Sequence, residues 1–166
     1  MTSIDIEQTA EINASAEDLW RILGEEFTEV GRWASAIDSS AALPGGAEAD
    51  PDRPAAGRTC HIGGFGDTEE RLVLFDRRNH RLAYTATASR IPSFVHDLRN
   101  EWNVAPADGT MSRVTAHITA QATGVLGALM APFLRRKLGS TLRLSLEDLR
   151  IYAESGQVSE ARRESA

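Results

Sequence analysis

Over residues 4–123 the hydrophobic positions alternate in short strand-like segments, whereas residues 128–154 show helical spacing. Alternation of apolar and polar side chains is typical of a half-buried strand. It is found at 4–12, 58–62, 69–75, 81–88, 98–104 and 112–123. Turn residues separate these segments at spacings of about ten residues, which favours antiparallel hairpins over parallel βαβ units. We therefore expect an antiparallel sheet curled around the final helix, with a cavity between the two.

The final helix carries one apolar stripe, made by leucines that recur every three or four residues: Leu138, Leu142, Leu146 and Leu149. Burial of each leucine contributes about 2 kcal/mol, which outweighs the cost of about 1 kcal/mol for Gly139 inside a helix. Pro132 allows two interpretations, because a proline is tolerated in a first turn and bends a helix interior. We favour a helix that begins near Gly127 and kinks at Pro132.

Two short helices are expected between the first two strand-like segments. Ser15 precedes an apolar helical pattern and has Asp18 three residues later, as in a capping box, and Gly24 is a plausible stop. A second helix over 25–34 would bury three side chains: Phe27, Val30 and Trp33. Residues 41–57 are rich in proline and glycine and predict a long loop, and residues 63–66 predict a tight glycine turn.

Length and composition indicate one ordinary globular domain over 1–155, followed by a polar tail at 156–166 that should be frayed. The formal net charge of −6 disfavours nucleic acid as the main partner. The basic run 135–137 indicates a solvated helix face rather than a membrane contact, and no segment predicts stable membrane insertion. A lone cysteine, Cys60, and the lack of a visible signal peptide make a cytoplasmic protein the default. A homodimer is left open.

Several segments in fixed order resemble the START-like, polyketide cyclase and Bet v 1 superfamily (SRPBCC proteins, helix-grip fold). The opening motif of that superfamily is similar to residues 13–20, and its second short helix to residues 27–36 with Trp33 at the centre. Its later signatures are similar to the following segments: Gly57-Arg58-Thr59, Glu69-Glu70-Arg71-Leu72 with Asp76, Arg81-Leu82-Ala83-Tyr84, Asp108-Gly109-Thr110 and residues 149–154. The resemblance therefore covers nearly the whole chain.

This resemblance implies an α+β fold in which a curved, seven-stranded antiparallel sheet wraps a long C-terminal helix and two short helices close one end. It also implies an internal cavity for lipids, polyketides, terpenoids or hormones. It implies no single activity, because the superfamily includes carriers, receptors, and aromatases or cyclases, and a shared fold does not fix function.

Strand alternation, helix spacing and the resemblance together predict the residues that line the cavity and contact the ligand. They are Trp33, Thr59, His61, Phe65, Glu70, Leu72, Leu74, Tyr84, Ala86, Asn100, Trp102, Ala116, Leu138 and Leu142. The resemblance places Glu70 on the concave side and makes residues 63–66 a loop that closes over the ligand, with Phe65 as its only bulky side chain.

Three of these residues are weak candidates for acid or base chemistry. Glu70 could be ion-paired or solvent-facing, or it could anchor the ligand. It could also transfer a proton, because a carboxylate in an apolar cavity tends to have a raised pKa. His61 could be a wall residue, a ligand contact or a base, and Tyr84 could serve for packing alone. The four histidines match no metal-binding spacing, so we expect no metal, and no nucleotide motif indicates a cofactor.

Three classes of function remain open: ligand binding, catalysis, and an interaction module without a ligand. The chain could bind a hydrophobic or amphipathic small molecule, with polar groups that orient it. It could instead be a cofactor-free polyketide cyclase, aromatase or dehydratase, which needs the same cavity and one or two groups for enolisation and loss of water. An interaction module without a ligand would have its interior filled by its own side chains, leaving no cavity of about 300 Å³ or more, the lower end for ligand sites.

Overall fold

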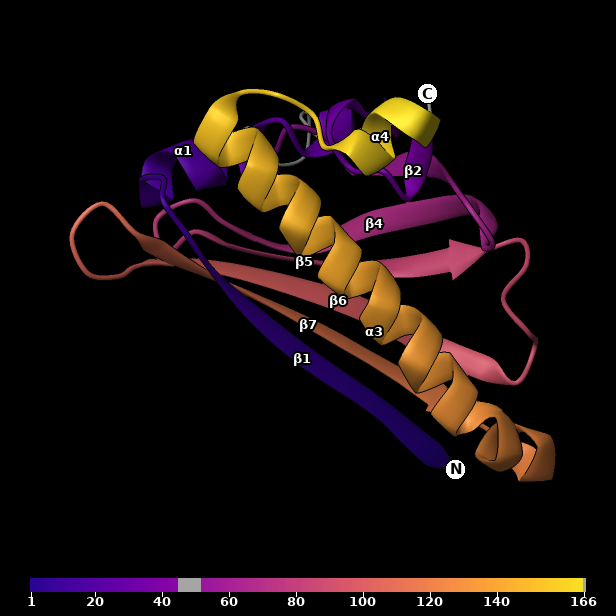
Figure 1. Ribbon diagram of the computed structural model, residues 1–166. Coiled ribbons are helices and arrows are strands. Elements are labelled where there is room, and N and C mark those ends of the chain that lie inside the picture. Colours follow the sequence, from indigo (N-terminus) through magenta and orange to yellow (C-terminus); the bar gives the residue numbers. More distant parts are fainter. Residues whose placement is uncertain (45–51, 166) are drawn as a thin grey trace.

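The computed structural model describes residues 1–44 and 52–165, and it has the predicted α+β helix-grip architecture. One antiparallel sheet of seven strands curves around the long helix α3, which crosses its concave face diagonally (Figure 1). The strands are β1 (Thr2–Ile12), β2 (Ile37–Ala42), β3 (Gly57–Ile62), β4 (Gly66–Asp76), β5 (Arg81–Ala88), β6 (Val95–Pro106) and β7 (Ser112–Ala122). Their order in the sheet is β1-β7-β6-β5-β4-β3-β2, so all connections except the one from β1 to β2 join neighbours.

Strand β2 is the element that the sequence pattern did not predict. Its sequence, IDSSAA, has one buried residue at its start, Ile37, and no apolar alternation after it. It forms the edge of the sheet and pairs only with β3, so its stability comes from backbone hydrogen bonds rather than from a buried face. The predicted loop over 41–57 is therefore wrong at Ala41 and Ala42, and its residues 45–51 lie outside the described part of the chain.

Helix α3 spans Gly124–Ser155 and buries the predicted leucine stripe at positions 138, 142, 146 and 149. It begins earlier than expected, so Pro132 lies in its interior, and the alternative of a start at Pro132 is wrong. The helix packs mainly against β1 and, less extensively, β7, at one side of the sheet. Space therefore remains between α3 and the strands on the other side.

The short helices close one end of the sheet, as expected. Ser15 caps α1 (Ala16–Trp20): its hydroxyl oxygen accepts the Asp18 backbone N–H at 3.1 Å. The chain does not stop at Gly24 but continues through a π-type turn, η1 (Arg21–Glu25), into a 3₁₀ helix, η2 (Phe27–Arg32). A Cβ at Gly24 would lie 2.7 Å from the Trp20 indole, so this glycine allows the turn to close over that ring.

The tail after α3 is more ordered than its composition predicted. Gly156 adopts a left-handed conformation and ends α3, and a further helix, α4, spans Glu160–Ser165. Ser159, which precedes α4, is buried and donates a hydrogen bond to the carboxylate of Asp148 in α3. The backbone N–H and the hydroxyl of Ser35 donate to the same carboxylate at 2.7 and 2.6 Å. Asp148 therefore ties α3, the tail and the segment before β2 together.

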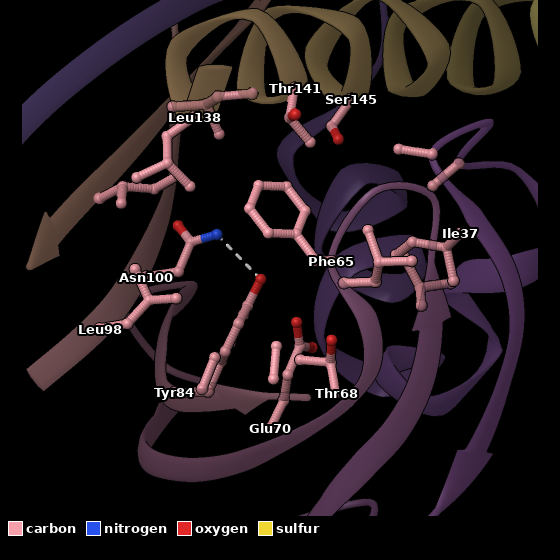
Figure 2. Close-up of a pocket in the computed structure, with 18 of the residues that line it drawn as sticks. Ile37, Phe65, Thr68, Glu70, Tyr84, Leu98, Asn100, Leu138, Thr141 and Ser145 are labelled. Carbon is pink, nitrogen blue, oxygen red and sulfur yellow. Dashed lines mark hydrogen bonds between the residues drawn. The ribbon is translucent and has the colours of Figure 1, made fainter. Parts of the chain in front are cut away.

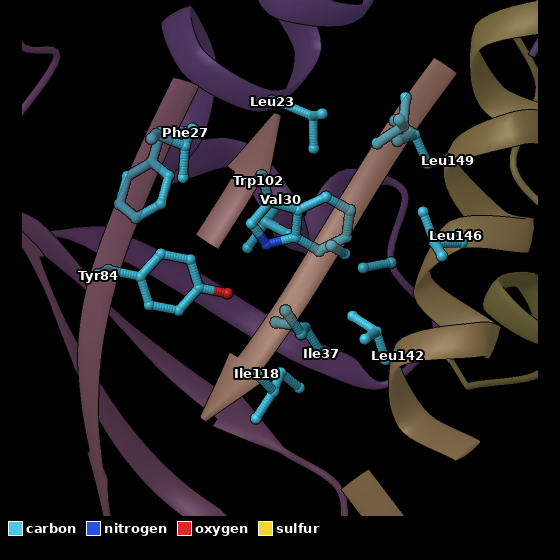
Figure 3. Packing of buried hydrophobic residues seen from close by; sticks show 14 of the residues in the cluster. Leu23, Phe27, Val30, Ile37, Tyr84, Trp102, Ile118, Leu142, Leu146 and Leu149 are labelled. Carbon is cyan, nitrogen blue, oxygen red and sulfur yellow. The ribbon is translucent and has the colours of Figure 1, made fainter. Parts of the chain in front are cut away.

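The apolar core fills the closed end of the molecule, between the short helices, the sheet and the second half of α3. Figure 3 shows Trp102 there, with Leu146 and Leu149 of α3 on one side and Leu23 and Val30 of the short helices near it. Among the helices that the structure describes, none combines the length and the apolar character needed to cross a bilayer.

Candidate functional site

An apolar cavity of about 110 Å³ lies between the sheet and the middle of α3 (Figure 2). Its floor comes from β3 to β7, one side from η2 and the segment after it, and its roof from α3. Apolar side chains make most of the wall, while Arg58, Glu70, Tyr84 and Asn100 bring polar atoms to it. The interior is therefore not filled completely, but the cavity is smaller than the volume of about 300 Å³ expected at the lower end of ligand sites.

Nine of the fourteen predicted side chains line this cavity: Trp33, Phe65, Glu70, Tyr84, Ala86, Asn100, Trp102, Leu138 and Leu142. They come from six separate elements or loops, which the curvature of the sheet brings around one space. Ala86 and Ala88 on β5 leave room where larger side chains would fill it. The contribution of these residues to ligand binding remains a prediction.

Three predicted residues on β4 and β7 lie elsewhere. Leu72 and Ala116 face the concave side but belong to the packed core beside the cavity. Leu74 turns to the opposite face, and a β-bulge is the reason. The register between β4 and β5 shifts between Leu72 and Leu74. Leu72 pairs with Tyr84, and Leu74, two residues later on β4, pairs with Ala83, which is only one residue away from Tyr84 on β5. Sequence alternation alone could not reveal this shift, since an inserted residue reverses the faces that follow it.

The expectation that Thr59 and His61 face the cavity is wrong, because the phase of β3 is the opposite one. Arg58 pairs with Glu70 and lies on the same, inward face, so Thr59 is exposed on the outer side. His61 also lies outside, where its Nδ1 is 2.8 Å from Asp67 Oδ1. Cys60 and Ile62 are the apolar side chains of this strand, and they share the inward face of Arg58.

Arg58 is the functional side chain that the sequence analysis missed, and it forms a buried ion pair with Glu70. Arg58 Nε donates to Glu70 Oε2 at 2.6 Å, and both residues are at most 5% exposed. Arg58 Nη1 donates to the Phe27 carbonyl at 2.6 Å, and the guanidinium lies 4.0 Å from the centre of the Phe27 ring. Burial alone would lower the pKa of Arg58, but the charge of Glu70, its hydrogen bond to Arg58 and the neighbouring Tyr84 and Cys60 together raise it. Arg58 therefore stays charged.

A hydrogen-bonded cluster lies beside this ion pair. Asn100 Nδ2 donates to the Tyr84 hydroxyl oxygen at 2.9 Å (Figure 2), and the Trp102 indole faces the same hydroxyl (Figure 3). Asn100 and Tyr84 are directly opposite each other on β6 and β5. Burial, and after it the nearby charge of Glu70, raise the pKa of Tyr84, so its hydroxyl keeps its proton.

Phe65 lines both this cavity and a second one. The second cavity, of about 120 Å³, lies between the β5–β6 connection and the first half of α3, and Phe65, Ile91, Leu98 and Leu138 line both. The turn that carries Phe65 includes two glycines with positive φ, Gly64 at 82° and Gly66 at 77°. Lys137 of α3 donates to the Gly64 carbonyl at 3.3 Å and lies 4.4 Å from the Phe65 ring centre. Phe65 is thus held both by its own turn, where its N–H donates to the Ile62 carbonyl at 3.0 Å, and by Lys137 of α3.

Two further kinds of chemistry, by a cysteine thiolate and by a bound metal ion, have little support among the described side chains. Cys60 is buried, and burial raises the pKa of its thiol to about 12, so a thiolate nucleophile is disfavoured. Within residues 1–44 and 52–165, no three His, Cys, Asp or Glu side chains gather closely enough to hold a metal ion.

Comparison with known proteins agrees with this architecture. A family model described as polyketide cyclase / dehydrase and lipid transport matches residues 3–154. No curated protein matches the chain. The solved structure of the protein XoxI from Bacillus cereus is similar, with a TM-score of 0.73 and 18% identity over 91% of this chain and 96% of that one.

Two further solved structures show the same fold. A protein from Thermobifida fusca has a TM-score of 0.72 and 20% identity, covering 95% of this chain and 97% of its own. A START superfamily protein from Mycobacterium smegmatis has a TM-score of 0.65 and 12% identity, covering 92% of this chain and 99% of its own. Identities this low support the fold and leave the activity to be argued from the cavity.

Proposed function

The chain belongs to the polyketide cyclase / dehydrase and lipid transport family, and from this premise we propose that it binds an apolar or amphipathic small molecule between the sheet and α3. The observation that carries the proposal is the cavity itself: an apolar chamber with a few converging polar groups, as in a small-molecule site, although its volume of about 110 Å³ is below the usual range, which begins at about 300 Å³. Its apolar wall would supply affinity by removing ligand surface from water, and its polar groups would orient the ligand.

The size of the cavity limits the part of a ligand that fits. A closed apolar cavity of about 150 Å³ is known to accept benzene, so about 110 Å³ suits a group no larger than one ring. A longer ligand would need the second cavity as well, and displacement of Phe65 would join the two. We therefore expect a ligand whose polar end lies near Tyr84 and whose apolar remainder extends past Phe65.

A titration with an environment-sensitive apolar dye tests this proposal, with quenching of Trp33 and Trp102 fluorescence as a second readout. Saturable binding with one site is expected. Ala86→Phe should abolish it by filling the cavity, whereas Thr87→Phe, one position along β5 on the exposed outer face, should leave it unchanged. Binding that is absent in the unmodified protein, or equal in both variants, would contradict the proposal.

A second candidate function, a cofactor-free cyclase or dehydratase, is favoured by one observation. Glu70 Oε2 is paired with Arg58, but within the described residues no donor is bonded to Oε1, and the side chain lies in the cavity wall. The Glu70 carboxylate, held in the wall by Arg58, would act as a base that removes a proton next to a carbonyl, with Tyr84 as the donor to the oxygen that becomes negative.

The obvious test of this second function needs a stability control. Glu70→Gln should abolish turnover of a poly-β-ketone thioester, but it also leaves the buried charge of Arg58 without its partner. The result therefore counts only if the variant still binds the dye and melts cooperatively. Unchanged turnover in such a folded variant would exclude Glu70 as the base.

A further inference from the structure

Asn100 carries an unused hydrogen-bond acceptor inside the cavity. Its Oδ1 is buried and has no partner in the described part of the chain, although Nδ2 of the same amide donates to Tyr84 at 2.9 Å. A buried acceptor without a partner costs about 1–3 kcal/mol, and such atoms in a folded protein call for an explanation. Asn100 lines the cavity, so a ligand can reach this side chain.

The Tyr84 hydroxyl provides an unused donor next to it. Its oxygen already accepts from Asn100 Nδ2, which leaves its own proton to be donated. Within residues 1–44 and 52–165 no acceptor is bonded to that proton. Figure 2 shows the Tyr84 hydroxyl and the Asn100 amide side by side in the cavity.

We propose that these two groups recognise a neutral hydroxyl on an otherwise apolar ligand. The ligand O–H donates to Asn100 Oδ1, and its oxygen accepts the proton of Tyr84, so one hydroxyl satisfies both groups at once. This inference rests on the proposed function and names the polar group that the ligand carries. An alcohol or a phenol has this pattern, whereas an ether or a ketone can only accept.

The charges in the wall disfavour an anionic ligand. Arg58 is the only cation in the wall of this cavity among the described residues, and its guanidinium is already bonded to Glu70 and to the Phe27 carbonyl. Glu70 is itself negative and close to Tyr84, so a ligand carboxylate would be desolvated beside a like charge. A hydroxyl escapes this penalty because it carries no charge.

Three single-ring probes of nearly equal size test the inference: 4-fluorophenol, 4-fluoroanisole and 4-fluorobenzoate, each followed by ¹⁹F NMR titration. We expect 4-fluorophenol to bind roughly ten- to a hundredfold more tightly than 4-fluoroanisole, which cannot donate to Asn100, and 4-fluorobenzoate to bind most weakly. Asn100→Leu should remove the preference for the phenol. Asn103→Leu, the same change on the outer face of β6, should keep it.

The outcomes separate this inference from the proposed function. Equal binding of phenol and anisole, or a preference for the phenol that survives in a folded Asn100→Leu protein, overturns the inference and leaves the cavity proposal standing. Preference for anisole also overturns it, because it means that the amide presents its N–H to the ligand. Saturable binding of none of the probes contradicts the proposed function itself.

Discussion

Arg58 and Glu70 place two opposite charges, 2.6 Å apart, in a wall that is otherwise largely apolar. The free-energy cost of burying these charges is offset by their mutual attraction and by the contacts of Arg58 with the Phe27 carbonyl and the Phe27 ring. Removal of one partner leaves the other buried without compensation, whereas removal of both leaves an apolar wall. The effect of each substitution on stability therefore depends on the state of the partner.

Glu70→Leu should lower the free energy of unfolding by about 3–5 kcal/mol, and Arg58→Met by a similar amount. The double variant Arg58→Met/Glu70→Leu should lose clearly less than the sum of the two single variants. Urea unfolding of the four proteins measures these values. Additive losses would show that the two charges do not depend on each other.

Cys60 provides a prediction on pH. Burial raises the pKa of its thiol from the ordinary value of 9.0 to about 12, so the unfolded chain loses this proton at a lower pH than the folded one. Stability from this group is therefore complete below about pH 9 and is lost as the pH rises towards 12. The stability difference between the unmodified protein and Cys60→Ala should shrink over this range in urea unfolding. A difference that is constant with pH would contradict the buried, protonated thiol.

At the scale of elements, the sequence predicted the strands and helices that have a clear apolar period. It missed those held by backbone hydrogen bonds or by a buried polar contact. The leucine stripe of α3 and the alternation of β5 and β7 follow directly from burial of one face. Edge strand β2 is held by backbone bonds to β3 and has almost no apolar signal. The faces of β3 and β4 depended on a buried arginine and a bulge, neither of which alternation can reveal.

Helix α4 illustrates the same limit. Its polar sequence predicted a frayed tail, but the hydrogen bond from Ser159 to Asp148 attaches this segment to α3.

Asp148→Ala should lower the free energy of unfolding by about 3 kcal/mol, because buried donors of Ser35 and Ser159 lose their acceptor. Ser159→Ala should cost about 1 kcal/mol and speed hydrogen exchange in residues 160–165. Ser140→Ala, at an exposed position of α3, is the control and should change neither. Unchanged exchange in Ser159→Ala would show that this bond does not hold the tail.

At the scale of the whole molecule, the cavity exists because α3 packs against β1 and β7, while the sheet curves away beneath its other side. Nine lining residues could be predicted from alternation and family resemblance, but the volume could not. It depends on where Phe65 lies and on how small residues such as Ala86 combine with large ones across the space.

Phe65 should control how quickly a ligand enters and leaves, because it lines both cavities. Phe65→Ala should raise the association and dissociation rates of a bound dye by about tenfold each, as expected for a barrier lowered by about 1.4 kcal/mol, with little change in affinity. Stopped-flow fluorescence measures both rates. Phe94→Ala, which alters the second cavity alone, should leave them nearly unchanged, and equal effects of the two substitutions would contradict a gating role.

The most direct test of the account is a crystal structure of the protein soaked with iodobenzene, with the iodine located by anomalous scattering. We expect one strong peak inside the chamber, among Tyr84, Ile118 and Leu142, and its loss in Ala86→Phe crystals. An interior without any peak, in crystals that carry iodobenzene only on the outer surface, would contradict a ligand-binding chamber between sheet and helix.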